Sequence, residues 1–556
     1  MKRRFLALSL LLLPFASCSN GSTEFWLPRN NLLPMVALDD HVAFVETNSQ
    51  TAFVLDPADA TFMPRRVPVG KAPVAALKRN GYNKLLVLSL GDPGSADIPA
   101  VAADLRIIDA NPAIDPVTYS LTGRFDGLAQ SDDGRFLVLY HSPSGQSQSG
   151  GALFNPNEMT LVDFTPQATP LVPTLTGKSI RSLGGVPSDI VFSPAYTFNN
   201  GRQRSLAMVL SQNYVTILDL DNPNNNEISV PLCPTSTGCT LIPVQVLFDP
   251  AHLKMYVRAN GSKDIFQITL TDIANTVPPP TPPSNDFVAS LSMLSAGANP
   301  ADMVLFGTGA NTRIAVASAD TKSLIIIDPT NSHSTTIATS IPANQIIPFT
   351  IPGLQPTDPP KQQALLVDRA LGSTSVLFAD LEQVETTGGL SIKDFPLGAA
   401  ASEVHALVDQ HIVVLVAGRF SSSAALTVVD LDTRSFSAIG AGSVLSVPTF
   451  ETNNPARQSR LWSVDQGTGL SYLDLVARPP NEPRLSTGET WLDQNIASIV
   501  PLAKPSIGGT RYLVVSHVDP TAIGNLTVLD ADHPDRAKAR TAHGFLLTNY
   551  LEREQP

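Results

Sequence analysis

The sequence has few charged residues and few cysteines for its length. Only 15% of its 556 residues are Asp, Glu, Lys or Arg, and three are cysteines. So small a charged fraction leaves too few side chains to cover the solvent-facing sides of many helices. Proline (47 residues) and glycine (35) are common, and Val, Ile, Thr and Leu occur in short runs. These features favour strands separated by turns, so we expect an all-β protein.

Clusters of basic residues are absent after the first four positions. The formal net charge is −12, and about −15 without Lys2, Arg3 and Arg4. Nucleic-acid binding requires a surface of clustered Lys and Arg, so we expect no nucleic-acid partner. Adsorption to anionic lipid is disfavoured for the same reason. No apolar stretch after Cys18 is long enough to cross a bilayer, so we expect the body of the protein to be soluble.

The N-terminus has the composition of an export signal. The basic residues Lys2 to Arg4 precede an apolar run, Phe5 to Leu13, that is short for a membrane span. Small residues then lead to Cys18, which is the order of a secretory signal peptide. We therefore predict that residues 1–17 are a signal peptide.

Positions 15–18, Phe-Ala-Ser-Cys, resemble the lipobox of bacterial lipoproteins, with Phe15 where that family usually has Leu. The resemblance implies that Cys18 receives diacylglycerol and becomes the new N-terminus, so that residues 18–31 form a lipidated tether. An anchor with more than one acyl chain holds a protein stably at a membrane. Under the sorting rule of enteric bacteria, Ser19 directs the protein to the outer membrane. The alternative is an ordinary signal peptide with an unrelated cysteine.

The other two cysteines, Cys233 and Cys239, are six positions apart with Pro234 and Gly238 between them. In an oxidising compartment we expect them to form a disulfide, which stabilises a loop of this size by roughly 2 kcal/mol. A metal site is the alternative. Two thiolates do not complete a tetrahedral zinc shell, and no histidine lies nearby in the sequence.

A repeated unit runs along the chain: a short apolar strand, a polar turn, and a later strand that ends in aspartate. The clearest copy has strands at 300–306, 313–317 and 323–328. Helical repeats would need apolar residues at i, i+3 and i+4, which these runs lack. A period of 44 to 59 residues with several strands predicts propeller blades. Ten such units occupy residues 32–556, and their strands end at Asp56, Asp109, Asp163, Asp219, Thr269, Asp328, Asp380, Asp430, Asp474 and Asp530.

Ten units exceed the four to eight blades of a typical ring. They can form one large ring, two smaller rings in tandem, or a common ring with surplus units. The proline-rich segment 276–285 is the candidate boundary between two rings, or else an insertion within one blade. We prefer a single closed or nearly closed assembly. Propellers often close by pairing N-terminal and C-terminal strands in one blade, and the final strand near 542–547 supports closure.

The repeats resemble the YVTN family of bacterial β-propellers, which are related to WD40 blades. The resemblance rests on the run from Pro187 to Pro194, on later strands that end in aspartate, such as Val215 to Asp219, and on fragments such as Met255 to Asn260. The Gly-His and Trp-Asp pairs of WD40 blades are absent. The resemblance implies the fold, because such propellers serve as binding platforms, lactonases and redox-enzyme scaffolds alike.

The sequence offers little chemistry. We interpret the repeated aspartates as turn residues. His405 and His411 are the closest histidine pair, and a metal shared between them is a weak alternative. Haem-attachment, P-loop and Gly-x-Ser-x-Gly motifs are absent, so we predict no catalytic residues, no metal and no cofactor.

Two hypotheses about function follow from these features. The first is a lipid-anchored scaffold that binds a protein or glycan partner at the cell envelope. The second is a propeller enzyme, lactonase-like or cofactor-dependent, with its site at the central channel.

Overall fold

The computed structural model describes residues 31–543, apart from 60, 62, 95–98, 144–154, 166–173, 181–184, 234–237, 277–279, 352–359, 370–372, 385–390, 398–399, 408–410, 418–424, 441–448, 453–458, 466, 476–484, 506–507 and 519–524. The predicted signal peptide, Cys18 and all but the last residue of the predicted tether lie outside the described residues.

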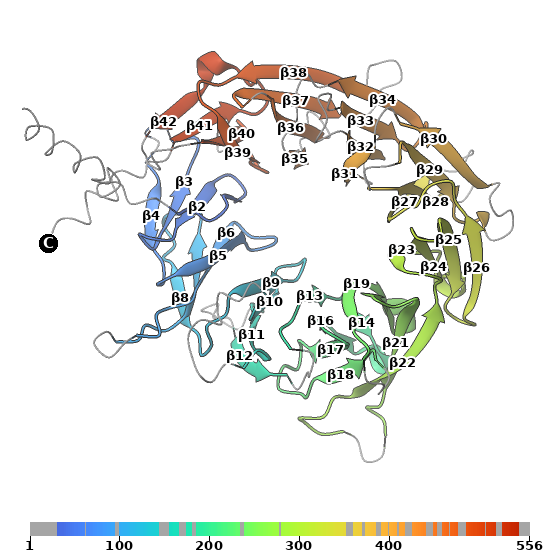
Figure 1. The fold of residues 1–556 in the computed structure, drawn as a ribbon. Helices are drawn as coiled ribbons and strands as arrows, with labels where there is room; N and C mark the ends of the chain where they lie inside the picture. Colours follow the sequence, from blue (N-terminus) through green and yellow to red (C-terminus); the bar gives the residue numbers. More distant parts are fainter. Residues whose placement is uncertain are drawn as a thin grey trace, which may run out of the picture.

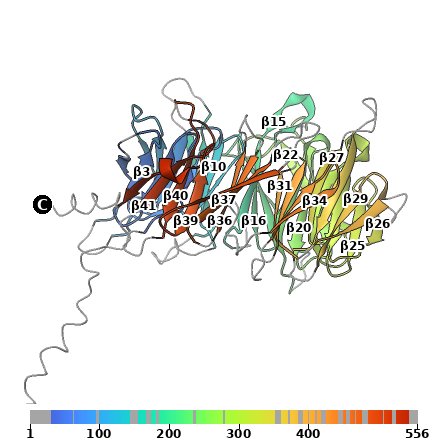
Figure 2. The same cartoon turned by 90° about the horizontal axis from the view of Figure 1, so that it is seen from above.

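Ten four-stranded antiparallel sheets, the blades, stand side by side around a central opening (Figures 1 and 2). Blade one consists of β1 (Val36–Ala37), β2 (Val42–Glu46), β3 (Thr51–Leu55) and β4 (Arg65–Pro68). Blade two consists of β5 (Pro73–Lys78), β6 (Lys84–Ser89), β7 (Asp104–Asp109) and β8 (Val117–Ser120). Blade three consists of β9 (Gly127–Gln130), β10 (Phe136–Tyr140), β11 (Glu158–Asp163) and β12 (Thr174–Ser179). Blade four consists of β13 (Asp189–Phe192), β16 (Leu206–Ser211), β17 (Tyr214–Asp219) and β18 (Ile228–Pro231), and its first loop carries the small hairpin β14 (Tyr196–Thr197) and β15 (Gln203–Arg204).

The remaining blades repeat this order. Blade five consists of β19 (Ile242–Asp249), β20 (Lys254–Asn260), β21 (Asp264–Asp272) and β22 (Phe287–Ser295). Blade six consists of β23 (Pro300–Phe306), β24 (Arg313–Ser318), β25 (Ser323–Asp328) and β26 (His333–Ala338). Blade seven consists of β27 (Gln345–Ile351), β28 (Lys361–Val367), β29 (Ser375–Asp380) and β30 (Ile392–Pro396). Blade eight consists of β31 (Ala401–Leu407), β32 (Ile412–Ala417), β33 (Ala425–Asp430) and β34 (Ser435–Gly440). Blade nine consists of β35 (Thr449–Thr452), β36 (Ser459–Asp465), β37 (Gly469–Leu475) and β38 (Leu485–Trp491). Blade ten consists of β39 (Ile496–Pro501), β40 (Tyr512–His517), β41 (Asn525–Asp530) and β42 (Arg540–His543).

Short 3₁₀ helices join some strands, namely η3 (Asn199–Gly201), η4 (Pro250–His252), η5 (Gly309–Asn311) and η8 (Arg536–Lys538). In the described part of the chain, no helix has the length and apolar character needed to span a membrane.

The predicted all-β fold with ten blades in a single ring is confirmed. The repeat-ending residues all belong to the third strand of a blade, either within it, as Thr269 in β21, or directly after it, as Asp56 after β3. The proline-rich segment connects β21 to β22 within blade five, so it does not separate two rings.

The middle strands explain the continuous apolar runs of the sequence. Every residue of β16 and β25 is buried, because both faces of each blade pack against neighbouring blades. Apolar clusters accordingly span pairs of blades, as where Val138 of blade three packs with Ala207 of blade four. A short, uninterrupted apolar run is what such a doubly covered strand requires.

The repeated aspartates act as turn residues, as predicted. Asp56 Oδ1 accepts a hydrogen bond from the backbone N–H of Ala58 at 2.8 Å. Asp328 Oδ1 accepts from both the N–H and the hydroxyl of Thr330, at 2.9 and 2.6 Å. Asp474 differs, because its carboxylate pairs with the buried guanidinium of Arg460. Aspartates such as Asp56 and Asp328 therefore hold the turns between third and fourth strands.

Within the described residues the ring closes without a shared strand, so the expectation that N-terminal and C-terminal strands pair in one blade was wrong for this part of the chain. Of the final strand expected near 542–547, only 542 and 543 are described, as the end of β42. Blade one is built from β1–β4 and blade ten from β39–β42, and the two lie side by side (Figure 1). Each terminal sheet already has four strands from its own end of the chain. Closure instead rests on an apolar seam in which Phe44 and Phe53 of blade one pack against Val514 and Val528 of blade ten.

Polar contacts add to this seam. Asp39, in the turn between β1 and β2, accepts hydrogen bonds from Lys504 Nζ at 2.5 Å and from Lys78 Nζ. Its carbonyl oxygen also accepts from the Lys504 backbone N–H at 2.8 Å. Arg540, in the outermost strand of blade ten, donates to the carbonyl oxygen of Asp59 at 3.1 Å. Asp39 thus connects blades ten, one and two.

The seam predicts a pH dependence of stability. Burial opposes ionisation of Asp39, but the hydrogen bonds and charges of Lys504 and Lys78 outweigh it and hold its pKa below the ordinary value. A carboxylate with a lowered folded-state pKa stabilises the fold above its unfolded pKa, near 4, and this stabilisation is lost as the pH falls through the folded pKa. Asp39→Asn should therefore lower Tm at pH 7 and reduce the loss of Tm between pH 5 and pH 2.

Calorimetry at a series of pH values measures both effects. The matched control is Asp115→Asn, an exposed position in the loop between β7 and β8. Equal pH profiles for the Asp39 variant and the wild type would show that this carboxylate contributes nothing to the acid sensitivity of the ring.

Candidate functional site

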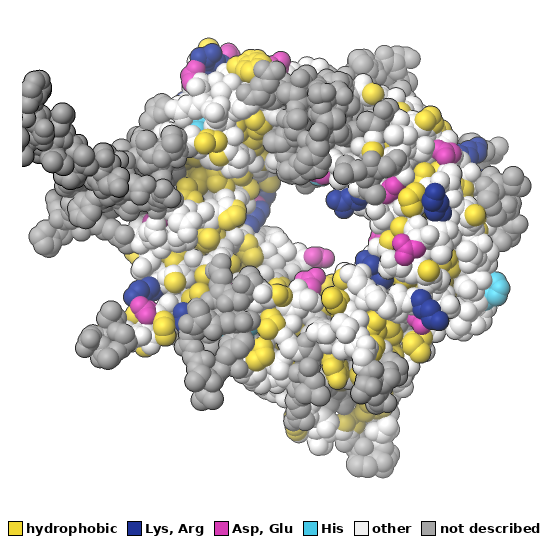
Figure 3. Space-filling model, viewed as in Figure 1, with side chains coloured by type: hydrophobic (Ala, Val, Ile, Leu, Met, Phe, Trp, Pro, Cys, Tyr) yellow, Lys and Arg dark blue, Asp and Glu magenta, His cyan; other side chains and the backbone are white. Residues whose placement is uncertain are grey.

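An open channel passes through the centre of the ring (Figure 3). Around its rim, Lys and Arg side chains alternate with Asp and Glu side chains and with apolar and uncharged ones, and no single type dominates. The innermost strand of each blade borders this channel (Figure 1). The polar residues of these strands are therefore candidates for a site in the channel.

At blades five to seven these rim residues bind one another. A bulge near the start of β19 and another near the start of β23 place Gln245 and Asp302 at equivalent positions. Gln245 Nε2 donates to Asp302 Oδ1 at 2.8 Å, and Asp302 Oδ2 accepts from the backbone N–H of Ile346 at 2.7 Å. Arg258 Nε donates to Gln245 Oε1 at 2.9 Å. These side chains hold successive blades together at the rim.

The two histidines of the metal alternative have separate partners. His405, in β31, lies with its Nε2 3.5 Å from Glu403 Oε2, and burial lowers the pKa of its imidazole. His411, in the turn before β32, has its Nδ1 2.5 Å from Asp432 Oδ1. Among the described residues, no group of three or more His, Cys, Asp and Glu is arranged to hold a metal ion. The structure therefore gives no support to a shared metal.

A cavity of about 510 Å³ is lined by residues of blades six, seven and eight, at one end of their strands. Its wall combines apolar residues with uncharged polar ones and one histidine, namely Leu305, Phe306, Pro348, Phe349, Thr350, Gln362, Gln363, Leu381 and His411. These residues lie where first strands end, second strands begin and third strands end. We call this side of the ring, formed by the turns between first and second and between third and fourth strands, the cavity face.

Two glutamines at the start of β28 are fixed by contacts to different blades. Successive residues of a strand point to opposite faces of the sheet, so Gln362 faces blade six and Gln363 faces blade eight. Gln362 Oε1 accepts from the backbone N–H of Gly307 at 2.5 Å, and Gln363 Oε1 accepts from Arg434 Nη2 at 2.9 Å. Because each amide oxygen is held in this way, each amide NH₂ group remains to donate to something else.

Gly307 is required at its position. Its φ is +79°, and a Cβ there would collide with the carbonyl group of Asn311. Such a left-handed conformation favours glycine. The tight turn aims the Gly307 N–H at Gln362, and so the sequence of blade six orients a side chain of blade seven.

His411 and Thr350 complete the polar wall. Because Nδ1 of His411 is bonded to Asp432, its Nε2 is the ring nitrogen left for a ligand. Thr350 is exposed at the end of β27, and its hydroxyl has no partner among the described residues. From the sequence, His411 was a candidate only as part of the closest histidine pair, and neither glutamine was a candidate. The adjacent pair Gln362-Gln363 at the start of an apolar strand was the available signal.

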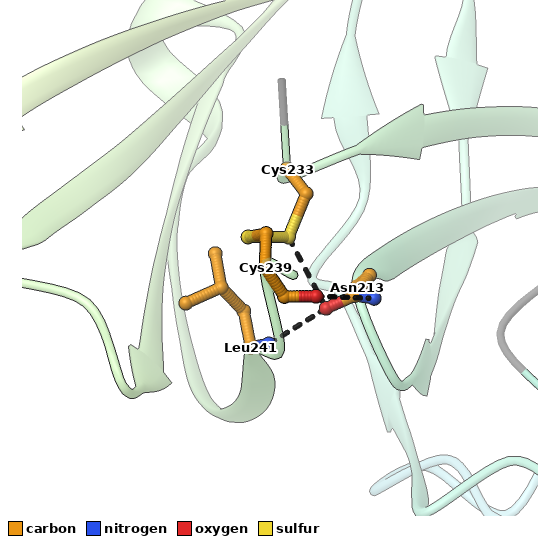
Figure 4. The surroundings of a disulfide bond; sticks show 4 residues. All are labelled: Asn213, Cys233, Cys239 and Leu241. Atoms are coloured by element: carbon orange, nitrogen blue, oxygen red, sulfur yellow. Dashed lines mark hydrogen bonds between the residues drawn. A yellow bond between two sulfur atoms is a disulfide. The ribbon is translucent and has the colours of Figure 1, made fainter. Parts of the chain in front are cut away.

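The predicted disulfide is present. Cys233 and Cys239 are bonded in the connection between blades four and five (Figure 4). Asn213, which has a φ of +68°, accepts a hydrogen bond from the N–H of Leu241 at 2.6 Å and donates to the carbonyl oxygen of Cys239 at 3.3 Å. The disulfide therefore fixes an inter-blade connection and is not part of the cavity.

The described chain begins on the side opposite the cavity. Asn31 donates its backbone N–H to Glu46 Oε1 at 3.2 Å, and Leu33 donates to the carbonyl oxygen of Val45 at 2.9 Å. Glu46 ends β2, so the chain enters beside the turn between the second and third strands of blade one. We call the side formed by such turns the tether face.

Comparisons with known proteins give only distant structural likenesses. No protein-family model matches the sequence, and no curated protein gives a significant match. Among solved structures, the chain is similar to dihydro-heme d1 dehydrogenase NirN in complex with DHE, with 11% identity over 92% of this chain and 76% of that one and a TM-score of 0.39. It is also similar to Saccharomyces cerevisiae Sqt1 (7% identity, 79% and 94% covered, TM-score 0.38) and to virginiamycin B lyase from Staphylococcus aureus (11%, 64% and 90%, 0.29). Likenesses this weak carry no argument about function.

Proposed function

We propose that this protein is an exported, lipid-anchored scaffold of the bacterial cell envelope, whose propeller binds a protein or glycan partner at the cavity face. The observation that supports this proposal is the cavity beside blade seven, where two amide groups are oriented by bonds to the neighbouring blades. Polar groups converging on a preformed cavity that also has apolar wall are typical of a binding site.

The position of the proposed anchor supports the same face. Thirteen positions separate Cys18 from Asn31. Thirteen residues span at most roughly 45 Å when fully extended. Because the chain enters on the tether face, a lipid on Cys18 would hold that face towards the membrane and turn the cavity face away from it. The sorting rule applied to Ser19 favours the outer membrane.

The alternative is an enzyme with its site at the central channel. At blades five to seven, the rim side chains that could serve such a site are bonded between blades, as Gln245 is to Asp302. An enzyme would need reactive side chains that are free of such bonds, whereas a binding role for the cavity face needs only the groups already oriented there. We therefore prefer the binding role.

Site-specific photo-crosslinking in membranes tests this proposal. A photoreactive residue replaces Thr350 at the cavity, or the matched Thr374, which is exposed on the tether face of the same blade. We expect the Thr350 variant to yield a discrete crosslinked partner that the Thr374 variant does not. Equal products from both positions, or products from Thr374 alone, would contradict a binding role for the cavity face.

A further inference from the structure

We propose that the cavity binds a saccharide, as a glycan end of one or two sugar units. This inference rests on the proposed function and names the ligand class of the same site. It follows from the size of the cavity, the charge of its wall, and the directions in which its polar groups are held.

The size fits a small organic ligand. A volume of about 510 Å³ lies within the range of roughly 300–1,000 Å³ that small-molecule pockets occupy. A single ion would leave most of this space to water. Pro348 and Thr350 are exposed, so the cavity can be reached from solvent on the cavity face.

The wall of the cavity is suited to a neutral ligand. None of the described residues that line it is Asp, Glu, Lys or Arg. The guanidinium of Arg434 behind the wall is used by Gln363, and the carboxylate of Asp432 by His411. A charged ligand would lose hydration without gaining an opposite charge in contact, which is costly. A neutral ligand has no such cost.

The wall has both apolar and polar surface, and a sugar has both as well. Leu305, which is partly exposed, and Pro348, which is exposed, offer apolar contact beside the two amide groups. A sugar ring presents C–H groups on its faces and hydroxyls at its edge. The aromatic rings do not offer a stacking platform, because Phe306 and Phe349 are only 8% and 3% exposed. This argues against a flat aromatic ligand such as a nucleobase.

The polar groups match hydroxyls. The NH₂ groups of Gln362 and Gln363 are donors, because their amide oxygens are already bonded. His411 Nδ1 faces the carboxylate of Asp432, so Nε2 is the ring nitrogen that can meet a ligand hydroxyl, and a hydroxyl can donate to it or accept from it. Thr350 can donate or accept. Sugar hydroxyls, which both donate and accept, satisfy this mixed set.

A double substitution, Gln362→Glu with Gln363→Glu, isolates the ligand-facing groups. The carboxylate oxygens still accept from Gly307 and Arg434, so the inter-blade bonds are retained while both NH₂ donors are lost. The matched control is Gln203→Glu in β15, an exposed position on blade four. Circular dichroism and Tm verify that all three proteins are folded alike.

Binding is measured by calorimetry and ligand-observed NMR on the mature chain. The probes are a neutral hexose disaccharide, an N-acetylhexosamine disaccharide and, as a non-carbohydrate, the dipeptide Ala-Ala. We expect at least one disaccharide to bind, and the double variant to bind it at least about tenfold more weakly, as the loss of two hydrogen bonds implies. The Gln203→Glu control should bind as the wild type does.

Three results would overturn the inference: no disaccharide bound, disaccharide binding unchanged in the double variant, or Ala-Ala bound in a glutamine-dependent way in place of both sugars. The crosslinking experiment keeps the two proposals separate. If Thr350 still captures a protein while no sugar binds, the saccharide inference fails and the binding role of the cavity face stands. If Thr350 captures nothing and no sugar binds, both fail.

Discussion

Replacing Phe53 with alanine should lower the free energy of unfolding by about 3–5 kcal/mol, the usual cost of deleting a buried phenylalanine side chain. Phe53, in β3, is fully buried in the seam between blades one and ten. Since blades one and ten share no strand among the described residues, packing at this seam carries much of the closure. Urea denaturation followed by fluorescence or circular dichroism measures the change.

Two controls give this experiment its meaning. Met63→Ala changes a side chain that is 67% exposed and should alter stability by no more than about 0.5 kcal/mol. Phe266→Ala removes a buried ring between blades four and five, away from the seam. Hydrogen exchange should then increase in blades one and ten for Phe53→Ala, but in blades four and five for Phe266→Ala. The same exchange pattern in both variants would show that the seam is no special point of closure.

Replacing Cys18 with serine should transfer the protein from the membrane fraction to the soluble fraction. The proposed lipid is attached through the Cys18 sulfur, and serine lacks that nucleophile. Without acyl chains, the proposed anchor loses the buried CH₂ groups that would hold it in a bilayer. Fractionation of cells followed by immunoblotting measures the distribution.

The matched control for Cys18→Ser is Cys233→Ser, which also removes one cysteine but affects only the disulfide to Cys239. This variant should remain in the membrane fraction. Retention of Cys18→Ser at the membrane would mean that residues 1–18 have been misinterpreted, and that something other than an acylated cysteine holds the chain there.

The blades could be predicted from the sequence because their turns repeat one piece of chemistry. An aspartate at the end of an apolar strand, as at Asp56 and Asp328, accepts backbone N–H groups in the following turn. That interaction is local, so it leaves a local pattern. The way the ring closes leaves no such pattern. It depends on whether the first and last sheets are each complete, and β1, with only Val36 and Ala37, is too short to identify.

The candidate site could not be predicted for a related reason. Its polar groups come from separate blades, and Gln363 is oriented by Arg434, which lies 71 positions later. Neither residue has a distinctive motif around it. A glutamine at the start of a strand usually faces solvent, and only the ring places Gln362 and Gln363 beside His411. The disulfide, by contrast, is a short-range feature and was predicted correctly.

The seam, the two faces and the cavity all depend on one claim, that ten blades close into a single ring. Electron cryo-microscopy of the purified protein tests it most directly, because views along the channel display each blade as a radial lobe. Ten lobes around one open channel is the predicted result. Two smaller rings, or a ring of seven or eight lobes with additional density beside it, would contradict the account.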